Sequence, residues 1–148
     1  TDRSPRWPAG FTGSLSHSAG TAFLLADNQG RLTGNDVEQW VSHTTADEIT
    51  GLLMNEQEKS LLKSCSLPWP VAVTVLFSLK ESLYKALWPI VGRYIDFLQA
   101  EITVFDPNTG HASLRLRETL GETLPQGRHF PARFLRTETQ VFSWIVTA

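Results

Sequence analysis

The sequence predicts an α+β fold in which antiparallel sheets and hairpins pack on one long helix. Three observations lead to this prediction: strand patterns fill residues 14–40, helical periodicity runs from Val71 to Trp88, and two hairpin patterns follow residue 99. Apolar residues that recur every three or four positions indicate a helix, whereas alternation of apolar and polar residues indicates a strand. Hairpins grouped around a single long helix are typical of α+β domains.

The composition is that of one globular domain. The 148 residues are enough to bury a core, with 41% hydrophobic and 19% charged residues. A net charge of -2 provides no basic field, so we expect no nucleic-acid partner. Cys65 has no second cysteine to pair with and is expected to be a buried or half-buried thiol. We recognise no signal peptide and no apolar run of ~20 residues, and therefore expect a cytoplasmic protein.

The first forty residues read as a loop followed by strands. Residues 1–13 are rich in proline and glycine and predict an ordered loop anchored by Trp7. Residues 14–40 predict an antiparallel pair, with "SLSHS" and "TAFLLAD" as a strand or strand pair. The "DNQG" turn then leads into a returning strand, "RLTGNDVEQW".

Three helices are expected next. A short one follows Thr45, and a second begins at Asn55, an N-cap residue with acids in the following turn. The break "LPWP" precedes the long helix, which we expect to run from Val71 to Trp88 and to end at Pro89 and Gly92. Its apolar stripe consists of Ala72, Leu76, Leu79, Leu83, Ala86 and Ile90.

Two hairpins complete the chain. The first is "AEITVFD", a "PNTG" turn and "HASLRLR". The second is "HFPARFLR", a "TETQ" turn and "VFSWIVTA". Alternating strands joined by turn residues are the usual hairpin signal.

The long helix also carries a polar stripe, and the spacing of its residues does not decide whether this side faces water or is covered. The stripe consists of Thr74, Ser78, Glu81 and Lys85. Glu81 and Lys85 stand in the favourable i, i+4 order, and a solvated salt bridge there would contribute ~0.3–0.5 kcal/mol. The flanking aromatics Phe77, Tyr84 and Trp88 indicate instead that this side is covered, so that the charges need partners.

Two further groups of polar residues admit both a structural and a functional interpretation. Asp36 and Glu38 share one face of a strand, as a water-facing pair or as ligands for Mg²⁺ or Mn²⁺. A third acid and a lysine on a covered helix would complete a phosphoryl-transfer site. Ser16 and His17 lie in a serine-rich strand, where the imidazole could bind a phosphate oxygen or be structural.

Three motifs in this order carry a resemblance to a known family. They are "RSPRWPAGFTGSLSHS", "GNDVE" and "FSLKESLYKA", beginning at Arg3, Gly34 and Phe77. The chain resembles the 4′-phosphopantetheinyl transferases of the larger, surfactin-synthetase-activating type, and is most similar to the enterobactin synthase component D branch. The third motif is the most specific, and the resemblance extends over nearly the whole chain.

The resemblance implies a role for each matching residue. Asp36, Glu38 and Glu81 match the acids that hold Mg²⁺ against the pyrophosphate of coenzyme A, and Glu81 also matches the candidate general base. Lys85 matches the catalytic-site lysine that contacts the phosphates. The residues that match coenzyme A contacts are Ser16 and His17, together with Arg3 at the nucleotide end.

The resemblance further implies transfer of 4′-phosphopantetheine from coenzyme A to a serine of an acyl or peptidyl carrier protein, in siderophore or other nonribosomal peptide synthesis. Positioning and charge neutralisation dominate such phosphoryl transfers. Carrier proteins are usually acidic, and we expect a basic and apolar docking patch around Lys59, Lys63 and the Leu61–Leu62 pair. The alternative is a catalytically inactive module of the same fold that binds a carrier protein or a partner half.

The sequence departs from the family pattern in two respects. Asn35 replaces the Ile or Val of the second motif, and a buried amide without partners would cost ~1–3 kcal/mol. The chain also corresponds to one part of a pseudo-twofold protein: residues 1–33 match the end of the first repeat and residues 34–148 the second. We therefore expect the cleft to be completed by an upstream half or by self-association.

Overall fold

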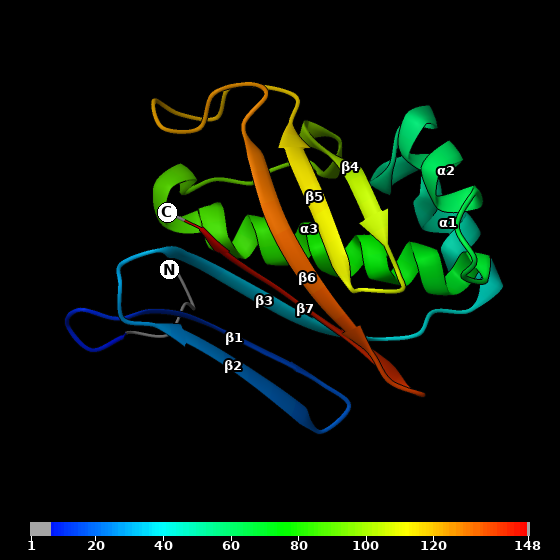
Figure 1. Cartoon of the computed structure of the whole chain (residues 1–148), viewed down its shortest axis with the longest axis horizontal. Coiled ribbons are helices and arrows are strands. Elements are labelled where there is room, and N and C mark those ends of the chain that lie inside the picture. Colours follow the sequence, from blue (N-terminus) through cyan, green and yellow to red (C-terminus); the bar gives the residue numbers. More distant parts are fainter. Residues whose placement is uncertain (1–6, 148) are drawn as a thin grey trace.

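The computed structural model describes residues 7–147 of the chain, and the expected α+β fold is confirmed. The five-stranded sheet packs on the long helix α3, and a separate two-stranded hairpin lies beside β3 (Figure 1). The strands are β1 (Thr12–Ser18), β2 (Thr21–Asp27), β3 (Leu32–Gln39), β4 (Ala100–Asp106), β5 (His111–Leu116), β6 (His129–Arg136) and β7 (Gln140–Thr147). The helices are α1 (His43–Leu53), α2 (Glu56–Lys63), α3 (Trp69–Val91) and the short 3₁₀ helix η1 (Phe97–Gln99).

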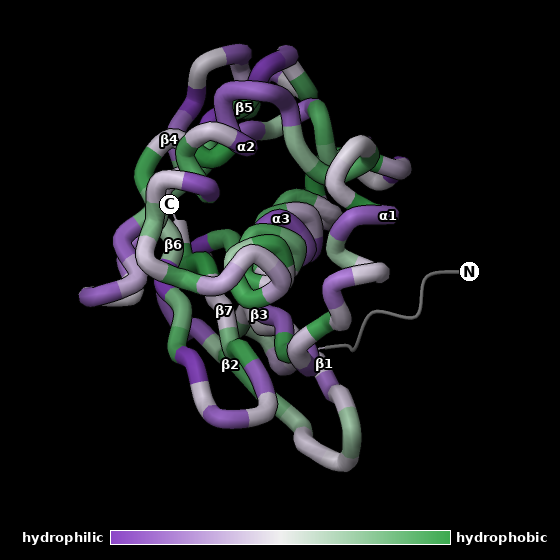
Figure 2. Tube along the Cα trace, turned by 90° about the vertical axis from the view of Figure 1, so that its right-hand side faces the viewer, coloured by the Kyte–Doolittle hydropathy of each residue, from purple (hydrophilic) through white to green (hydrophobic). Residues whose placement is uncertain are grey.

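The five-stranded sheet has the order β3-β7-β6-β5-β4, with every pair antiparallel. Both C-terminal hairpins form as expected, β4 with β5 and β6 with β7. Seen nearly along its axis, α3 occupies the middle of the molecule, with β4 and β6 on one side, α1 on the other and α2 above it next to β4 (Figure 2). The sheet and the two short helices together account for the burial of most of α3.

The strand β3 does not pair with β2, so the expected antiparallel pair over residues 14–40 is wrong in its second half. β1 and β2 form a separate two-stranded hairpin, whereas β3 pairs along its whole length with β7. Residues 33–37 of β3 are all buried, which requires cover on both faces. The helix α3 packs on one face of β3, the β1–β2 hairpin lies against the strand on its other side, and β7 pairs with it along its length.

β1 nevertheless lies along β3 and completes its hydrogen bonding through side chains. The backbone N–H of Asn35 donates to Ser14 Oγ at 3.0 Å, and that of Val37 donates to Ser16 Oγ at 3.1 Å. Edge strands leave a row of unpaired backbone donors, and here two serine hydroxyls accept from them. The hairpin is thereby attached to the sheet at the strand that carries the "GNDVE" motif.

The helix α3 is longer than predicted at its C-terminal end. Pro89 lies inside the helix rather than ending it, and the chain leaves at Gly92, whose φ of +63° forms the predicted cap. A proline in a helix removes one backbone hydrogen bond, and here only Ile90 and Val91 follow it before the helix ends. Ile90, expected on the buried stripe, is 45% exposed.

Three smaller expectations can be compared with the structure. Asn55 caps α2, with its side chain accepting from Glu58 N–H and Glu58 accepting from Asn55 N–H. Trp7 packs over Gly13, and Cys65 is half-buried and free. Over residues 7–147, no helix is both long and apolar enough to cross a membrane.

Gly34 sets the distance between β3 and α3. A Cβ atom at this position would lie 1.9 Å from the carbonyl oxygen of Ser82 and 2.6 Å from the backbone nitrogen of Ala86. Both are backbone atoms of α3, so no side-chain rotation can relieve the overlap. A residue without a side chain is therefore required where the first residue of the "GNDVE" motif meets the helix.

We expect Gly34→Ala to lower the free energy of unfolding by about 3 kcal/mol, because α3 must move away from β3. The measurement is urea denaturation followed by circular dichroism. The matched control is Gly51→Ala in α1, where an added Cβ meets nothing within 4 Å. That change should be neutral or stabilise by up to about 1 kcal/mol, as alanine is the better helix former. Equal effects of the two substitutions would contradict the close approach.

Candidate active site

The face of β3 opposite the Ser14 and Ser16 contacts presents its carboxylates to α3. Asp36 is almost fully buried and Glu38 half-buried. On the facing helix, Lys85 Nζ lies 3.3 Å from Asp36 Oδ1, so the lysine pairs with β3, and among residues 7–147 it forms no ion pair with Glu81 of its own helix. The polar stripe of α3 is therefore covered, as the flanking aromatics indicated.

Serine hydroxyls hold α3 against β7 next to these carboxylates. The hydroxyl of Ser143 lies 2.7 Å from those of Ser78 and Ser82, and all three side chains are buried. Small residues at this contact let the helix and the sheet approach closely. Within the polar stripe, Ser78 therefore contributes to the packing of α3 on β7, whereas Glu81 and Lys85 carry the charges.

Three carboxylates influence one another in this region. Burial raises the pKa of Asp36 and of Glu81 above their usual values, and the negative charge of Asp36 adds to the effect on Glu81. Burial and the neighbouring charges of Asp36 and Glu81 raise the pKa of Glu38 to about 8. Like charges held together in a partly dry environment favour protonation or a cation.

The donor chemistry of the cluster fits a hard divalent cation. Asp36 Oδ2 is buried and has no hydrogen-bond partner, which leaves a carboxylate oxygen unsatisfied. Oxygen donors of this kind suit Mg²⁺ or Mn²⁺, which commonly keep waters and substrate phosphates as further ligands. Within residues 7–147, no group of three or more carboxylate, imidazole or thiol side chains is already arranged to hold a metal. Lys85 supplies positive charge at Asp36.

The raised pKa of Glu38 predicts a pH dependence of stability. Its folded-state pKa of about 8 lies above the ordinary 4.5, so the folded protein holds a proton that the unfolded chain releases. This contribution is complete below the unfolded-state pKa and is lost as the pH rises through the folded-state value. The free energy of unfolding should therefore fall between about pH 5 and about pH 8.

Chemical denaturation across that range tests the pH prediction. Glu38→Gln should flatten the decline, leaving the smaller contributions of the same sign from Asp36 and Glu81. Asp27, whose pKa is lowered to about 2 by Arg31, loses its contribution only in more acidic solution and does not interfere. Equal pH profiles for the wild type and the Gln variant would contradict the assignment.

The residues expected to contact coenzyme A lie on β1 or outside the described residues. Ser16 is buried, and its hydroxyl accepts the hydrogen bond from β3 described above. His17 lies on the opposite, exposed face of the hairpin. Arg3 falls outside residues 7–147. The roles of these three residues toward coenzyme A stay predictions.

Asn35 finds partners for part of its side chain. It is fully buried, and its amide Nδ2 donates to the carbonyl oxygen of Phe23 in β2 at 2.9 Å. Its Oδ1 is buried without a partner. The amide therefore attaches the β1–β2 hairpin to β3 at the cost of one unsatisfied oxygen, and the strand keeps its register.

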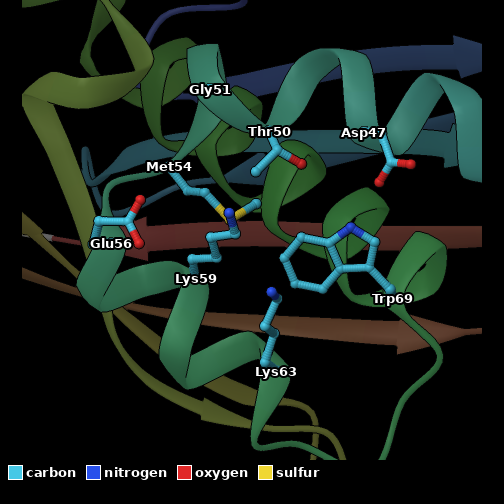
Figure 3. Close-up of a pocket in the computed structure, with 8 residues that line it drawn as sticks. All are labelled: Asp47, Thr50, Gly51, Met54, Glu56, Lys59, Lys63 and Trp69. Atoms are coloured by element: carbon cyan, nitrogen blue, oxygen red, sulfur yellow. The ribbon is translucent and has the colours of Figure 1, made fainter.

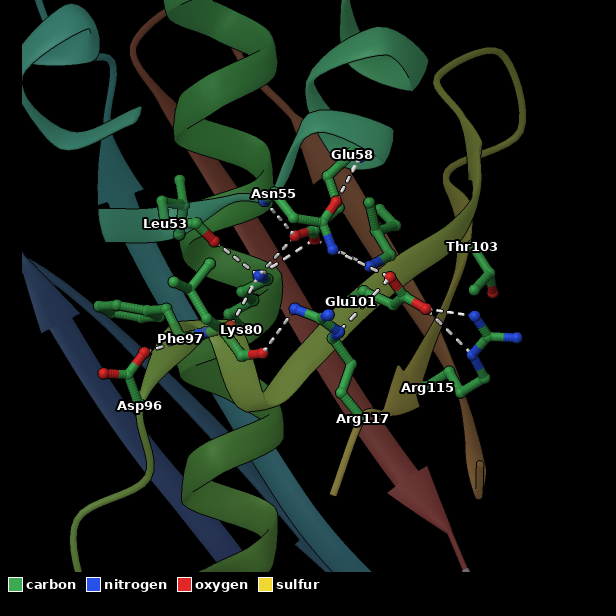
Figure 4. Close-up of polar contacts among 12 residues, drawn as sticks. Leu53, Asn55, Glu58, Lys80, Asp96, Phe97, Glu101, Thr103, Arg115 and Arg117 are labelled. Carbon is green, nitrogen blue, oxygen red and sulfur yellow. Dashed lines mark hydrogen bonds and ion pairs between the residues drawn. The ribbon is translucent and has the colours of Figure 1, made fainter. Parts of the chain in front are cut away.

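Lys80 is a residue whose importance sequence reasoning missed. Its ammonium is completely buried and donates to the carbonyl oxygens of Leu53 at 2.6 Å and Phe97 at 2.8 Å. It also lies 3.0 and 3.2 Å from the carboxylate oxygens of Glu58 (Figure 4). Lys80 follows Leu76 by four positions and precedes Leu83 by three, so its place on the apolar face was the available signal.

The Lys80 network fixes α3 relative to its neighbours. Glu58 accepts in addition from the backbone N–H of Ile102 in β4 at 2.9 Å. Nearby, Asn55 Nδ2 donates to Glu101, which also pairs with Arg115 (Figure 4). Residues of α1, α2, η1 and β4 are therefore connected to Lys80, directly or through Glu58. Because Lys80 immediately precedes Glu81, these contacts fix the rotation of α3 and with it the direction of the Glu81 side chain.

The predicted docking patch on α2 is only partly a surface feature. Leu62 is buried in the core, so its placement on the surface was wrong, and Leu61 is half-buried. Lys59 and Lys63 do line a cavity of about 340 Å³, but Asp47 and Glu56 line it as well (Figure 3). The Lys63 ammonium lies 5.7 Å from the centre of the Trp69 ring. With two acids beside the two lysines, the cavity lacks the basic character that an acidic partner would need.

Comparison with known proteins shows the family to which the chain belongs. Residues 33–140, which include β3 and α3, match the model of the 4′-phosphopantetheinyl transferase superfamily. The chain belongs to the 4′-phosphopantetheinyl transferase superfamily. The match begins one residue before the "GNDVE" motif and therefore includes Asp36, Glu38, Glu81 and Lys85.

Individual members of the superfamily give the same result. Enterobactin synthase component D of Salmonella typhi is 40% identical over 114 residues, or 77% of this chain and 47% of that protein. Its counterpart in Salmonella typhimurium is 35% identical over 136 residues, 92% of this chain and 53% of that protein. The 4′-phosphopantetheinyl transferase Svp of Streptomyces mobaraensis is 28% identical over 114 residues. The chain spans about half the length of these relatives.

Proposed function

We propose that this chain carries the acidic and phosphate-facing part of an enzyme that transfers 4′-phosphopantetheine from coenzyme A to a serine of an acyl or peptidyl carrier protein. The likeness to enterobactin synthase component D favours a carrier protein of siderophore or other nonribosomal peptide synthesis. The observation that carries the proposal is the meeting of Asp36, Glu38, Glu81 and Lys85 between β3 and α3.

Each of these side chains has a proposed task. Lys85, half-exposed beside Asp36, binds and orients the phosphates. Asp36, Glu38 and Glu81 would hold Mg²⁺, with Mn²⁺ as the alternative; when bound, the ion neutralises charge on the pyrophosphate. Glu81 accepts the proton of the attacking serine hydroxyl, directly or through water, and burial raises its pKa in the direction that suits a base near neutral pH. Positioning and electrostatics of this kind dominate phosphoryl transfer.

The proposed location of this reaction is the cytoplasm. Cys65 is a free thiol, as is usual in a reducing compartment. Coenzyme A and newly made carrier proteins are both present there.

Mass spectrometry of the carrier protein tests the proposal. The chain is incubated with Mg²⁺, coenzyme A and an apo-peptidyl carrier protein, and the carrier should gain the mass of one phosphopantetheine arm. Glu81→Gln should abolish the gain, while Glu48→Gln, an exposed acid on α1, should leave it unchanged. Carrier binding without any mass gain would favour the inactive binding module instead.

A further inference from the structure

Two hollows flank the C-terminal half of α3, and Lys85 lines both of them. The larger, about 730 Å³, is bounded by β1, the start of β3 and the end of α3. The smaller, about 330 Å³, lies between α3 and residues 93–97 and is lined by Glu81 as well as Lys85. The candidate reactive groups Glu81 and Lys85 therefore lie on the part of α3 that separates two hollows of unequal size, and we call this part the ridge.

Phosphoryl transfer needs two such approaches. The attacking and leaving oxygens lie roughly in line on opposite sides of the phosphorus, so donor and acceptor reach the ridge from different directions. Coenzyme A, with its nucleotide, pyrophosphate and pantetheine arm, requires the larger space. The smaller hollow, which Glu81 lines, then remains for the hydroxyl acceptor.

The rim of the smaller hollow has the character of a protein-binding surface. Tyr94 is 74% exposed, and Arg93 is exposed without an ion pair or hydrogen bond to any residue in the range 7–147. Aromatic side chains and arginine are the types most enriched where proteins bind one another. An unpaired guanidinium beside an exposed aromatic ring complements a partner that is acidic and partly apolar.

The backbone next to this rim, at Asp96 and Phe97, is held in place before any partner arrives. The hydroxyl of Tyr84 donates to the carbonyl oxygen of Asp96 at 2.8 Å, and the buried Lys80 holds the carbonyl oxygen of Phe97. The Phe97 ring packs against those of Phe77 and Tyr84, with centroid distances of 5.6 Å. A rim next to backbone fixed in this way loses little conformational freedom on binding, which favours recognition.

We propose that the smaller hollow is the acceptor entrance, at which Arg93 and Tyr94 receive the acidic surface of the carrier protein that presents the serine to Glu81. This inference rests on the proposed function and names the surface that its second substrate uses. Arg93 contacts an acidic side chain of the carrier, and Tyr94 packs against an apolar one.

The test compares Arg93→Glu and Tyr94→Ala with the wild-type chain in two assays. In steady-state transfer to an apo-peptidyl carrier protein of net negative charge, Arg93→Glu should raise the KM for the carrier by about tenfold or more and leave the KM for coenzyme A unchanged. Tyr94→Ala should act in the same direction. Arg133→Glu, an exposed arginine on β6 that lines neither hollow, is the matched control and should change neither constant.

Titration calorimetry with the same apo-carrier supplies a readout that does not depend on chemistry. Arg93→Glu should weaken carrier binding by about tenfold or more. A rise in the KM for coenzyme A instead would place Arg93 at the donor's phosphates and overturn the inference, as would unchanged carrier binding. If the wild type binds the carrier but transfers nothing, the proposed activity fails while the calorimetric comparison still decides the role of Arg93.

Discussion

Replacing Lys80 by methionine should lower the free energy of unfolding by about 3–5 kcal/mol, the largest stability effect that we expect in this protein. Methionine keeps most of the side-chain volume, so the loss comes from the buried polar groups. The carboxylate of Glu58 would be left uncompensated, and the carbonyl oxygens of Leu53 and Phe97 would lose their donor. Urea denaturation measures the effect, with Lys59→Met at a partly exposed position of α2 as the control expected to stay within about 0.5 kcal/mol.

A double-mutant cycle isolates the charge from the packing. Glu58→Gln in the wild-type background breaks the pair and should be destabilising by about 1.5–3 kcal/mol. In the Lys80→Met background the same change removes a buried unpaired charge and should be neutral or stabilising. Additive effects of the two substitutions would show that the ion pair is not coupled and would contradict this account of the network.

Replacing Asp36 by asparagine should decrease the proposed transfer by at least about 100-fold while leaving the fold as stable as before or more so. Asparagine keeps the shape and one oxygen, but it removes the charge on which cation and phosphate neutralisation would depend. The pKa of Asp36 is raised by burial, which means that ionisation of this carboxyl is less favourable in the folded protein than in the unfolded chain. If Asp36→Asn loses activity without losing stability, the charge of Asp36 serves the reaction and not the fold.

Two measurements complete this second test. Thermal unfolding with and without Mg²⁺ should show stabilisation of the wild type by the ion and a smaller effect, or none, in Asp36→Asn. Asp47→Asn, an exposed acid on α1, should behave as the wild type in both activity and Mg²⁺ response. Retained transfer by Asp36→Asn would remove Asp36 from the site.

Much of the fold could be predicted because its signals are local. The cap at Asn55, the end at Gly92 and the two C-terminal hairpins follow from residue types whose preferences act over a few positions. The pairing of β3 could not be predicted in this way. Its partner β7 lies about a hundred residues further along the chain, and a turn signal after β2 carries no information on such a distant strand.

The same distinction between local signals and contacts of distant segments applies to the candidate site. The sequence by itself predicted that Asp36, Glu38, Glu81 and Lys85 form one site, because the motifs that contain them resemble those of a known family, and membership of that family is shown. Only the tertiary structure decided that Lys85 pairs with Asp36 and that the lack of a side chain at Gly34 lets α3 approach β3 closely. It also decided that Lys80 is buried and forms an ion pair with Glu58. Spacing along a helix tells which side chains share a face, whereas burial and ion pairing depend on which distant element covers that face.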